Sequence, residues 1–138
     1  MPLLRQTEVR TFLHDFFHDG TCLRHPVQLR EAGSDAGRLR VARWTVARGY
    51  RALGRLEDAE RIQRELADEN AKAHEEDSYV YEELAELALA RGDHAAAAPW
   101  AAKAYALLRE DAWFAATEPA RLKRLADIGS GTPPSRKP

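Results

Sequence analysis

The chain has 138 residues, a formal net charge of −1 and one cysteine, Cys22. A single cysteine excludes a disulfide within the chain, and the absence of any run of about 18 apolar residues excludes a membrane-spanning helix. Arg5 and Glu8 interrupt the stretch that would be apolar in a signal peptide, so we expect a cytoplasmic protein.

Charge is segregated along the chain although the total is near zero. Residues 30–64 carry nine Arg against five acidic residues, and residues 65–93 carry ten acidic residues against two bases. A surface that binds nucleic acid keeps a positive sign where it meets phosphates. An acidic block in the middle of the chain therefore argues against a nucleic-acid partner. The Ala- and Arg-rich composition favours helix throughout and is typical of a bacterial protein from a GC-rich genome.

The amino-terminal residues 1–37 contain one amphipathic stretch. Its apolar residues recur at helical spacing and are Val9, Phe12, Leu13, Phe16 and Phe17. A loop through Gly33 and Gly37 is expected to follow. The stretch predicts a helix, whose role in the fold depends on what comes after it.

Four longer segments show the three-four spacing of apolar residues that is typical of helices. They cover residues 38–53, 56–73, 79–90 and 95–108, and Gly54 and Gly92 divide them into two hairpins. Asp93 is a suitable N-cap for the last helix, because its carboxylate can accept hydrogen bonds from unpaired backbone N–H groups. Pro99 lies inside that helix, where it removes one backbone hydrogen bond and is expected to bend the helix.

A short helix is expected to end the ordered part of the chain over residues 112–128. Thr117 suits its N-cap, Pro119 its first turn and Gly129 its end. Residues 129–138, with the sequence GSGTPPSRKP, are expected to form a flexible tail.

The two hairpins repeat one pattern of large, small and glycine residues. Aligning Gly54 with Gly92 places Ala47 on Ala85 and Ala59 on Ala97, and Val46 and Leu84 precede the first pair. This pattern resembles the tetratricopeptide repeat over about half of the chain. The resemblance implies an all-α solenoid of antiparallel helical hairpins, in which small residues let the helix backbones approach. The two glycines are 38 residues apart rather than the 34 of that family, which lengthens one helix by about a turn.

We therefore expect one helical-repeat domain over residues 1–128. Within it, residues 38–76 form the first repeat, residues 77–111 the second, and residues 112–128 a capping helix sealed by Trp113, Phe114 and Trp100. Residues 1–37 form either a degenerate first repeat or an amino-terminal cap. Gly20 lies 34 residues before Gly54, which favours a repeat, but His25-Pro26 occupies the place of a small packing residue.

The register of the resemblance implies which residues line a partner-binding groove. They are Trp44, Arg48, Arg51, Tyr79, Glu82 and Glu86. An aromatic residue flanked by Arg suits a binding hot spot, although Trp44 could equally pack on the amino-terminal helix. The acidic residues Glu75, Glu76, Asp77, Glu82, Glu83 and Glu86 are expected to be solvent-exposed rather than catalytic.

His14 and His18 lie four residues apart, on one face of the expected helix, with Cys22 beyond them. Such a set could share a metal ion. The simpler interpretation is surface histidines at the carboxyl end of a helix, where they favour the helix dipole. No catalytic constellation or cofactor motif is present in the sequence. We expect a non-catalytic module without a cofactor that binds a protein or peptide or self-associates; the alternative is a metal-binding protein that uses these three residues.

Overall fold

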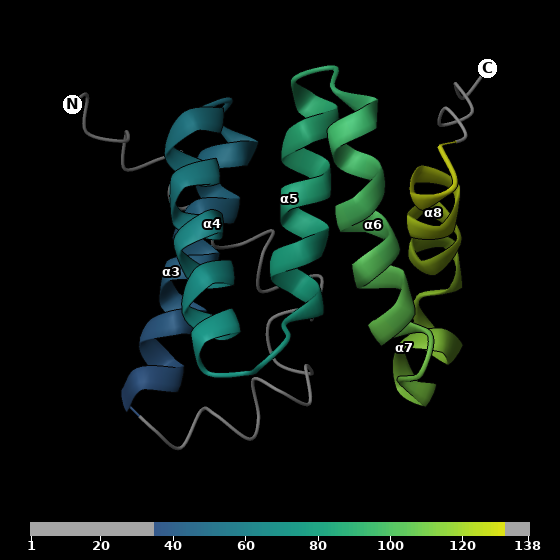
Figure 1. Ribbon diagram of the computed structural model, residues 1–138, viewed down its shortest axis with the longest axis horizontal. Coiled ribbons are helices and arrows are strands. Elements are labelled where there is room, and N and C mark those ends of the chain that lie inside the picture. Colours follow the sequence, from purple (N-terminus) through teal and green to yellow (C-terminus); the bar gives the residue numbers. More distant parts are fainter. Residues whose placement is uncertain (1–34, 132–138) are drawn as a thin grey trace. The chain divides into compact units, whose positions relative to one another are not determined.

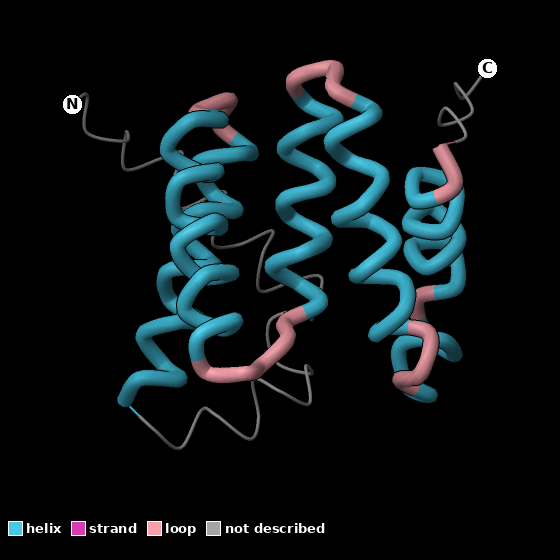
Figure 2. Tube along the Cα trace, in the orientation of Figure 1, coloured by secondary structure: helices cyan, strands magenta, loops and turns pink. Residues whose placement is uncertain are grey.

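The computed structural model describes residues 35–131, and all regular secondary structure in that range is helical. The helices are α3 (Asp35–Ala52), α4 (Leu56–Lys72), α5 (Ser78–Ala90), α6 (His94–Leu108), α7 (Ala112–Thr117) and α8 (Pro119–Gly129) (Figures 1 and 2). This confirms the expected all-α class. Most of the segment 1–37 and of the tail 129–138 lies outside the described residues. The chain divides into two compact units, residues 1–59 and 60–138.

Glycines shape the two hairpin turns in the same way. Gly54, between α3 and α4, and Gly92, between α5 and α6, both have φ of +76°, a left-handed conformation that costs glycine little. In the first turn the N–H of Arg55 donates to the carbonyl of Tyr50 at 2.8 Å. In the second the N–H of Asp93 donates to the carbonyl of Ala88 at 2.9 Å. Both are Schellman turns, so the repeated glycine is a backbone requirement.

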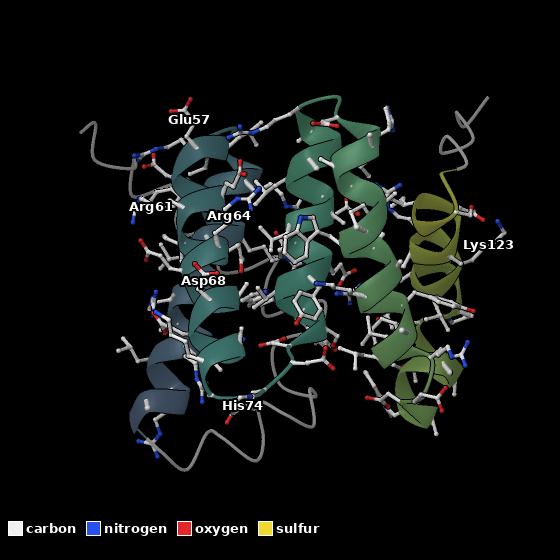
Figure 3. All side chains as sticks on the ribbon, viewed as in Figure 1. Glu57, Arg61, Arg64, Asp68, His74 and Lys123 are labelled. Atoms are coloured by element: carbon white, nitrogen blue, oxygen red, sulfur yellow. The ribbon has the colours of Figure 1, made fainter. Side chains whose placement is uncertain are left out.

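The turn between α4 and α5 uses the same geometry without a glycine. His74 has φ of +56°, and the N–H of Glu75 donates to the carbonyl of Asn70 at 2.9 Å. His74 lies at the start of this turn (Figure 3). A side chain in the left-handed region brings Cβ close to the backbone, which costs about 1 kcal/mol. The α4–α5 connection is therefore strained at one residue.

Aspartates cap the starts of three consecutive helices. Asp77 accepts from the N–H of Tyr79 at 2.9 Å, Asp93 from that of Ala96 at 2.9 Å, and Asp111 from that of Trp113 at 3.0 Å. The cap expected at Asp93 is confirmed. The cap expected at Thr117 is wrong. Its hydroxyl instead donates back to the carbonyl of Trp113 at 2.7 Å, and α8 starts with Pro119 in its first turn.

The first unit buries one face of α3. Trp44 is 3% exposed, and Ala47 and Ala59 are fully buried. Leu39, Val46 and Leu53, which contribute to the apolar spacing of residues 38–53, are exposed. The spacing predicts a helix but does not say which of its faces packs, because apolar residues lie on two faces.

The second unit packs α6 against both α5 and α8, which lie on either side of it (Figure 1). The contact surfaces are made of small residues, and four alanines of the hairpin are fully buried: Ala85, Ala97, Ala101 and Ala104. Gly129 belongs to the same kind of contact, since a Cβ there would lie 3.1 Å from the backbone of Ala102. Gly129 therefore permits close packing of α8 on α6; it does not stop the helix by a left-handed turn.

α6 runs without interruption from His94 to Leu108 through Pro99, which lies on its exposed side. Solvent can therefore satisfy the carbonyl of Ala95 that Pro99 leaves without its usual donor. The expected bend stays a prediction. No helix within residues 35–131 combines the length and hydrophobicity needed to cross a bilayer.

Gln63 of α4 is the most unusual polar residue in the interior. Its side chain is fully buried, and within the described part of the chain neither its amide nitrogen nor its amide oxygen has a hydrogen-bond partner. An unsatisfied buried amide costs about 1–3 kcal/mol. Gln63 therefore lowers the stability of the buried face of α4.

Replacing the strained residue tests the account of the α4–α5 turn. We expect His74→Gly to raise the free energy of unfolding by about 0.5–1 kcal/mol, because glycine adopts the left-handed conformation without strain. Ala71→Gly, three residues earlier and within α4, is the matched control and should lower it by about 1 kcal/mol. Urea unfolding of both variants measures the difference; a destabilised His74→Gly contradicts the account.

Candidate functional site

The six residues expected in a partner-binding groove divide into two groups on α3 and α5. Trp44, Tyr79 and Glu82 are buried, at 3%, 2% and 7% exposure. Arg48, Arg51 and Glu86 are half-buried. The guanidinium carbon of Arg48 lies 5.6 Å from the centre of a Trp44 ring, a cation–π contact within α3. Tyr79, Glu82 and Glu86 follow one face of α5.

Side chains of α8 cover this face of α5. Arg121 donates to both carboxylate oxygens of Glu82, at 2.5 and 2.6 Å. One helical turn further along, Arg124 donates to both oxygens of Glu86, at 2.8 and 2.9 Å. Bidentate pairs of this kind fix orientation as well as distance. A partner cannot reach Tyr79 and Glu82 while α8 is in place, so neither residue enters the binding surface that we propose below.

Aromatic rings surround the ion pair between Arg121 and Glu82. The guanidinium of Arg121 lies 5.4 Å from the ring of Tyr79 and 5.2 Å from that of Phe114, and the two rings meet edge to face at 6.4 Å. Burial by itself would lower the pKa of Arg121, but the hydrogen bonds and charge of Glu82 outweigh it and raise the pKa. Burial also raises the pKa of Tyr79, against the opposing charge of Arg121. Phe114 is fully buried, whereas Trp113 remains 37% exposed. That these residues seal the end of a repeat stack stays a prediction.

The interpretation of Glu82 and Glu83 as solvent-exposed acids was wrong. Glu82 is 7% and Glu83 is 5% exposed. Arg121 of α8 lies against Glu82. Burial of Glu82 is tolerable because a guanidinium on α8 neutralises it. The sequence did hold a signal for this contact: two acids four residues apart on α5 match two Arg three residues apart in the expected capping helix.

An aromatic surface that the sequence did not reveal lies on the α5–α6 hairpin. The rings of Tyr81 and Trp100 stack with their centres 5.8 Å apart and an angle of 27° between their planes. The ammonium of Lys103 lies 5.5 Å from the first ring and 5.0 Å from the second. The rings are half-buried, and Lys103 is exposed. We call these three residues the aromatic platform.

The sequence placed Trp100 against the capping helix, and the structure corrects this. Trp100 and Lys103 are three residues apart on α6, so they share a face, but their pairing with Tyr81 depends on how α6 packs on α5. Burial raises the pKa of Tyr81, with further increases from the negative charges of Glu76 and Asp77. The platform therefore has a cation at its rings, and the negative charges of two carboxylates act on Tyr81.

The metal candidates His14, His18 and Cys22 lie outside the described residues. Within residues 35–131 no group of three or more His, Cys, Asp and Glu side chains is arranged to hold a metal ion. The aromatic platform is therefore the candidate site in the part of the chain that the structure describes.

None of the known protein families, curated proteins or solved structures matches the chain. Its function must therefore be inferred from its own residues.

Removing one member of the buried ion pair tests its role in holding α8. We expect Arg121→Leu to lower the free energy of unfolding by about 3 kcal/mol, because Glu82 stays buried without its counter-charge. Replacing both residues with Leu should recover most of the loss. Lys123, whose pair with Asp127 is exposed and which points away from α6 (Figure 3), gives the control Lys123→Leu, expected within about 0.5 kcal/mol of wild type. If Arg121→Leu and Lys123→Leu lower the free energy of unfolding equally in urea, the ion pair does not have this role.

The raised pKa of Tyr79 makes stability depend on pH in the alkaline range. The unfolded chain ionises this phenol near its ordinary pKa of 10.0, whereas the folded chain keeps it neutral to higher pH. Stability is therefore fully present below about pH 10 and falls above it, by up to about 1.4 kcal/mol per pH unit for one proton. We expect Tyr79→Phe to lessen this fall in urea unfolding between about pH 8 and pH 11. If the free energy of unfolding has the same pH profile in wild type and in Tyr79→Phe, Tyr79 does not cause this fall.

Proposed function

We propose that the chain is a non-catalytic, cytoplasmic protein-interaction module of the tetratricopeptide-repeat type, which binds a protein or peptide partner at the aromatic platform. The observation that carries the proposal is the stacked, half-exposed pair Tyr81 and Trp100 with Lys103 above both rings. Trp and Tyr are enriched among residues that dominate binding energy, because they offer large, rigid contact areas.

The backbone conformation of the turns and the packing of the alanines support the assignment to this repeat type. Turns at Gly54 and Gly92 share one φ value and one hydrogen-bond pattern. The alanine at each matched position is fully buried, namely Ala47, Ala59, Ala85 and Ala97. Stacked hairpins of this type leave side chains of the helices on an extended surface that suits protein binding.

The charges around the platform favour a partner that carries both signs. Lys103 contributes a cation at the rings, and the carboxylates of Glu76 and Asp77 act on Tyr81. A peptide or helix with an apolar residue for the rings, an acid near Lys103 and a base near Glu76 would complement this surface. Arg48 and Arg51 on α3 stay additional candidates for partner contact.

The test compares two variants of the full chain as bait in an extract of the organism that encodes it. We expect Trp100→Ala/Lys103→Glu to lose the bound partner by at least about tenfold, because a hot-spot residue contributes about 2 kcal/mol or more. The control Lys123→Glu changes charge equally on exposed α8 and should retain the partner. Circular dichroism and thermal unfolding check that both variants fold. Capture of the same proteins by wild type and by the platform variant would disprove the proposal.

A further inference from the structure

Small side chains form a line along the exposed side of α6. Ala95, Pro99, Ala102 and Ala106 are all exposed, and their spacing of four, three and four residues places them on one side of the helix. We call these four residues the small-residue strip. The strip covers about 16 Å, or three helical turns. Because none of its side chains extends far from the backbone, a second helix can lie close along it.

The aromatic platform borders the small-residue strip on the side of α5. Trp100 and Lys103 each come one residue after a member of the strip, so both project to the same side of it. That side faces α5, since Trp100 stacks on Tyr81. The exposed surface of the hairpin therefore joins a flat strip to two large, half-buried rings.

This surface carries a single cation. Lys103 is the only Lys, Arg, Asp or Glu in α6. Its ammonium lies against both rings of the platform, is exposed, and forms no ion pair within residues 35–131. The rings limit where the ammonium can move. A partner that covers this surface must therefore supply one acid at that position, because the cation would otherwise lose water without gaining a counter-charge.

We propose that the partner segment which binds the aromatic platform is an amphipathic helix that lies along α6, with one Asp or Glu of its apolar face on Lys103. This inference rests on the proposed function and specifies the chemistry of the partner. The apolar face of the helix contacts the small-residue strip and the rings, which provide most of the affinity. The acid fixes the register, as a single polar residue does where two helices pack.

Charge argues against a second copy of α6 as this helix. Two copies that pack through the same strip bring their Lys103 side chains toward each other, and α6 has no acid to place between them. Like charges that face each other lower affinity. An extended peptide, in turn, contacts the rings but makes no use of the length of the strip.

Selection from a peptide display library tests the proposal, with the full chain as the target. The library encodes helices of about 18 residues, randomised along one face, and a second library of the same length has no helical bias. We expect wild type to select an Asp or Glu at one position of an apolar helical face. We expect Lys103→Glu to select Lys or Arg at that position, because the preferred charge follows the charge of the platform. Selection of the same residue by both proteins overturns the proposal.

Titration calorimetry with the selected acidic peptide measures the two contacts separately. We expect Lys103→Glu to weaken binding by at least about tenfold, and a copy of the peptide with Lys in place of the acid to recover most of this loss. Ala106→Gln should weaken binding about tenfold, because a longer side chain on the strip holds the helix away. The control Lys123→Glu on α8 should bind as wild type does. Full affinity in Ala106→Gln contradicts a helix along α6.

The outcomes separate this inference from the proposed function. Selected peptides that lose binding with Trp100→Ala, but are extended in circular dichroism or carry no acid, refute the helix and leave the platform as a binding site. Failure to select any peptide that depends on Trp100 refutes both proposals. Light scattering that gives twice the chain mass for wild type, but not for Ala106→Gln, assigns the surface to a second copy and also refutes the helix of a different partner.

Discussion

The ion pair between Arg121 and Glu82 is the interaction on which the second unit depends. It joins residues 39 positions apart, lies among the rings of Tyr79 and Phe114, and orients α8 on α5. Two charges in such surroundings are stable only together, because each is costly to bury alone. The pair therefore fixes the orientation of α8 on α5. The apolar residues beneath α8 provide the buried surface area of the contact.

Small residues set how closely the helices approach. Four alanines of the α5–α6 hairpin are fully buried, and Gly129 brings α8 against the backbone of α6. Side chains of this size bury little apolar area each, so stability must come from the few large groups between them, such as Leu87 and Leu125. The aromatic platform follows from the same arrangement: a narrow α5–α6 contact lets Tyr81 and Trp100 stack at its edge.

The sequence was informative where local rules decide the structure. Helix bounds and the turns at Gly54 and Gly92 could be predicted, because periodicity and glycine conformation are local properties. The solvent exposure of Val46 and the burial of Glu82 could not, since each depends on which face of a helix meets another helix. The aromatic platform was missed for the same reason: Trp100 and Lys103 share a face of α6, but their partner ring comes from α5. The groove that the resemblance implies stays a prediction, with Arg48 and Arg51 of α3 among its candidate residues.

The charge pattern on α5 also limits how such a chain can grow by gene duplication. A copied hairpin inserted after α6 would move α8, with Arg121 and Arg124, from the original α5 to the copy. Glu82 and Glu86 of the original helix would then lose their counter-charges, unless the copy acquired bases at the facing positions. Lengthening the protein therefore requires charge substitutions in addition to the duplication, which favours a short array over a long one.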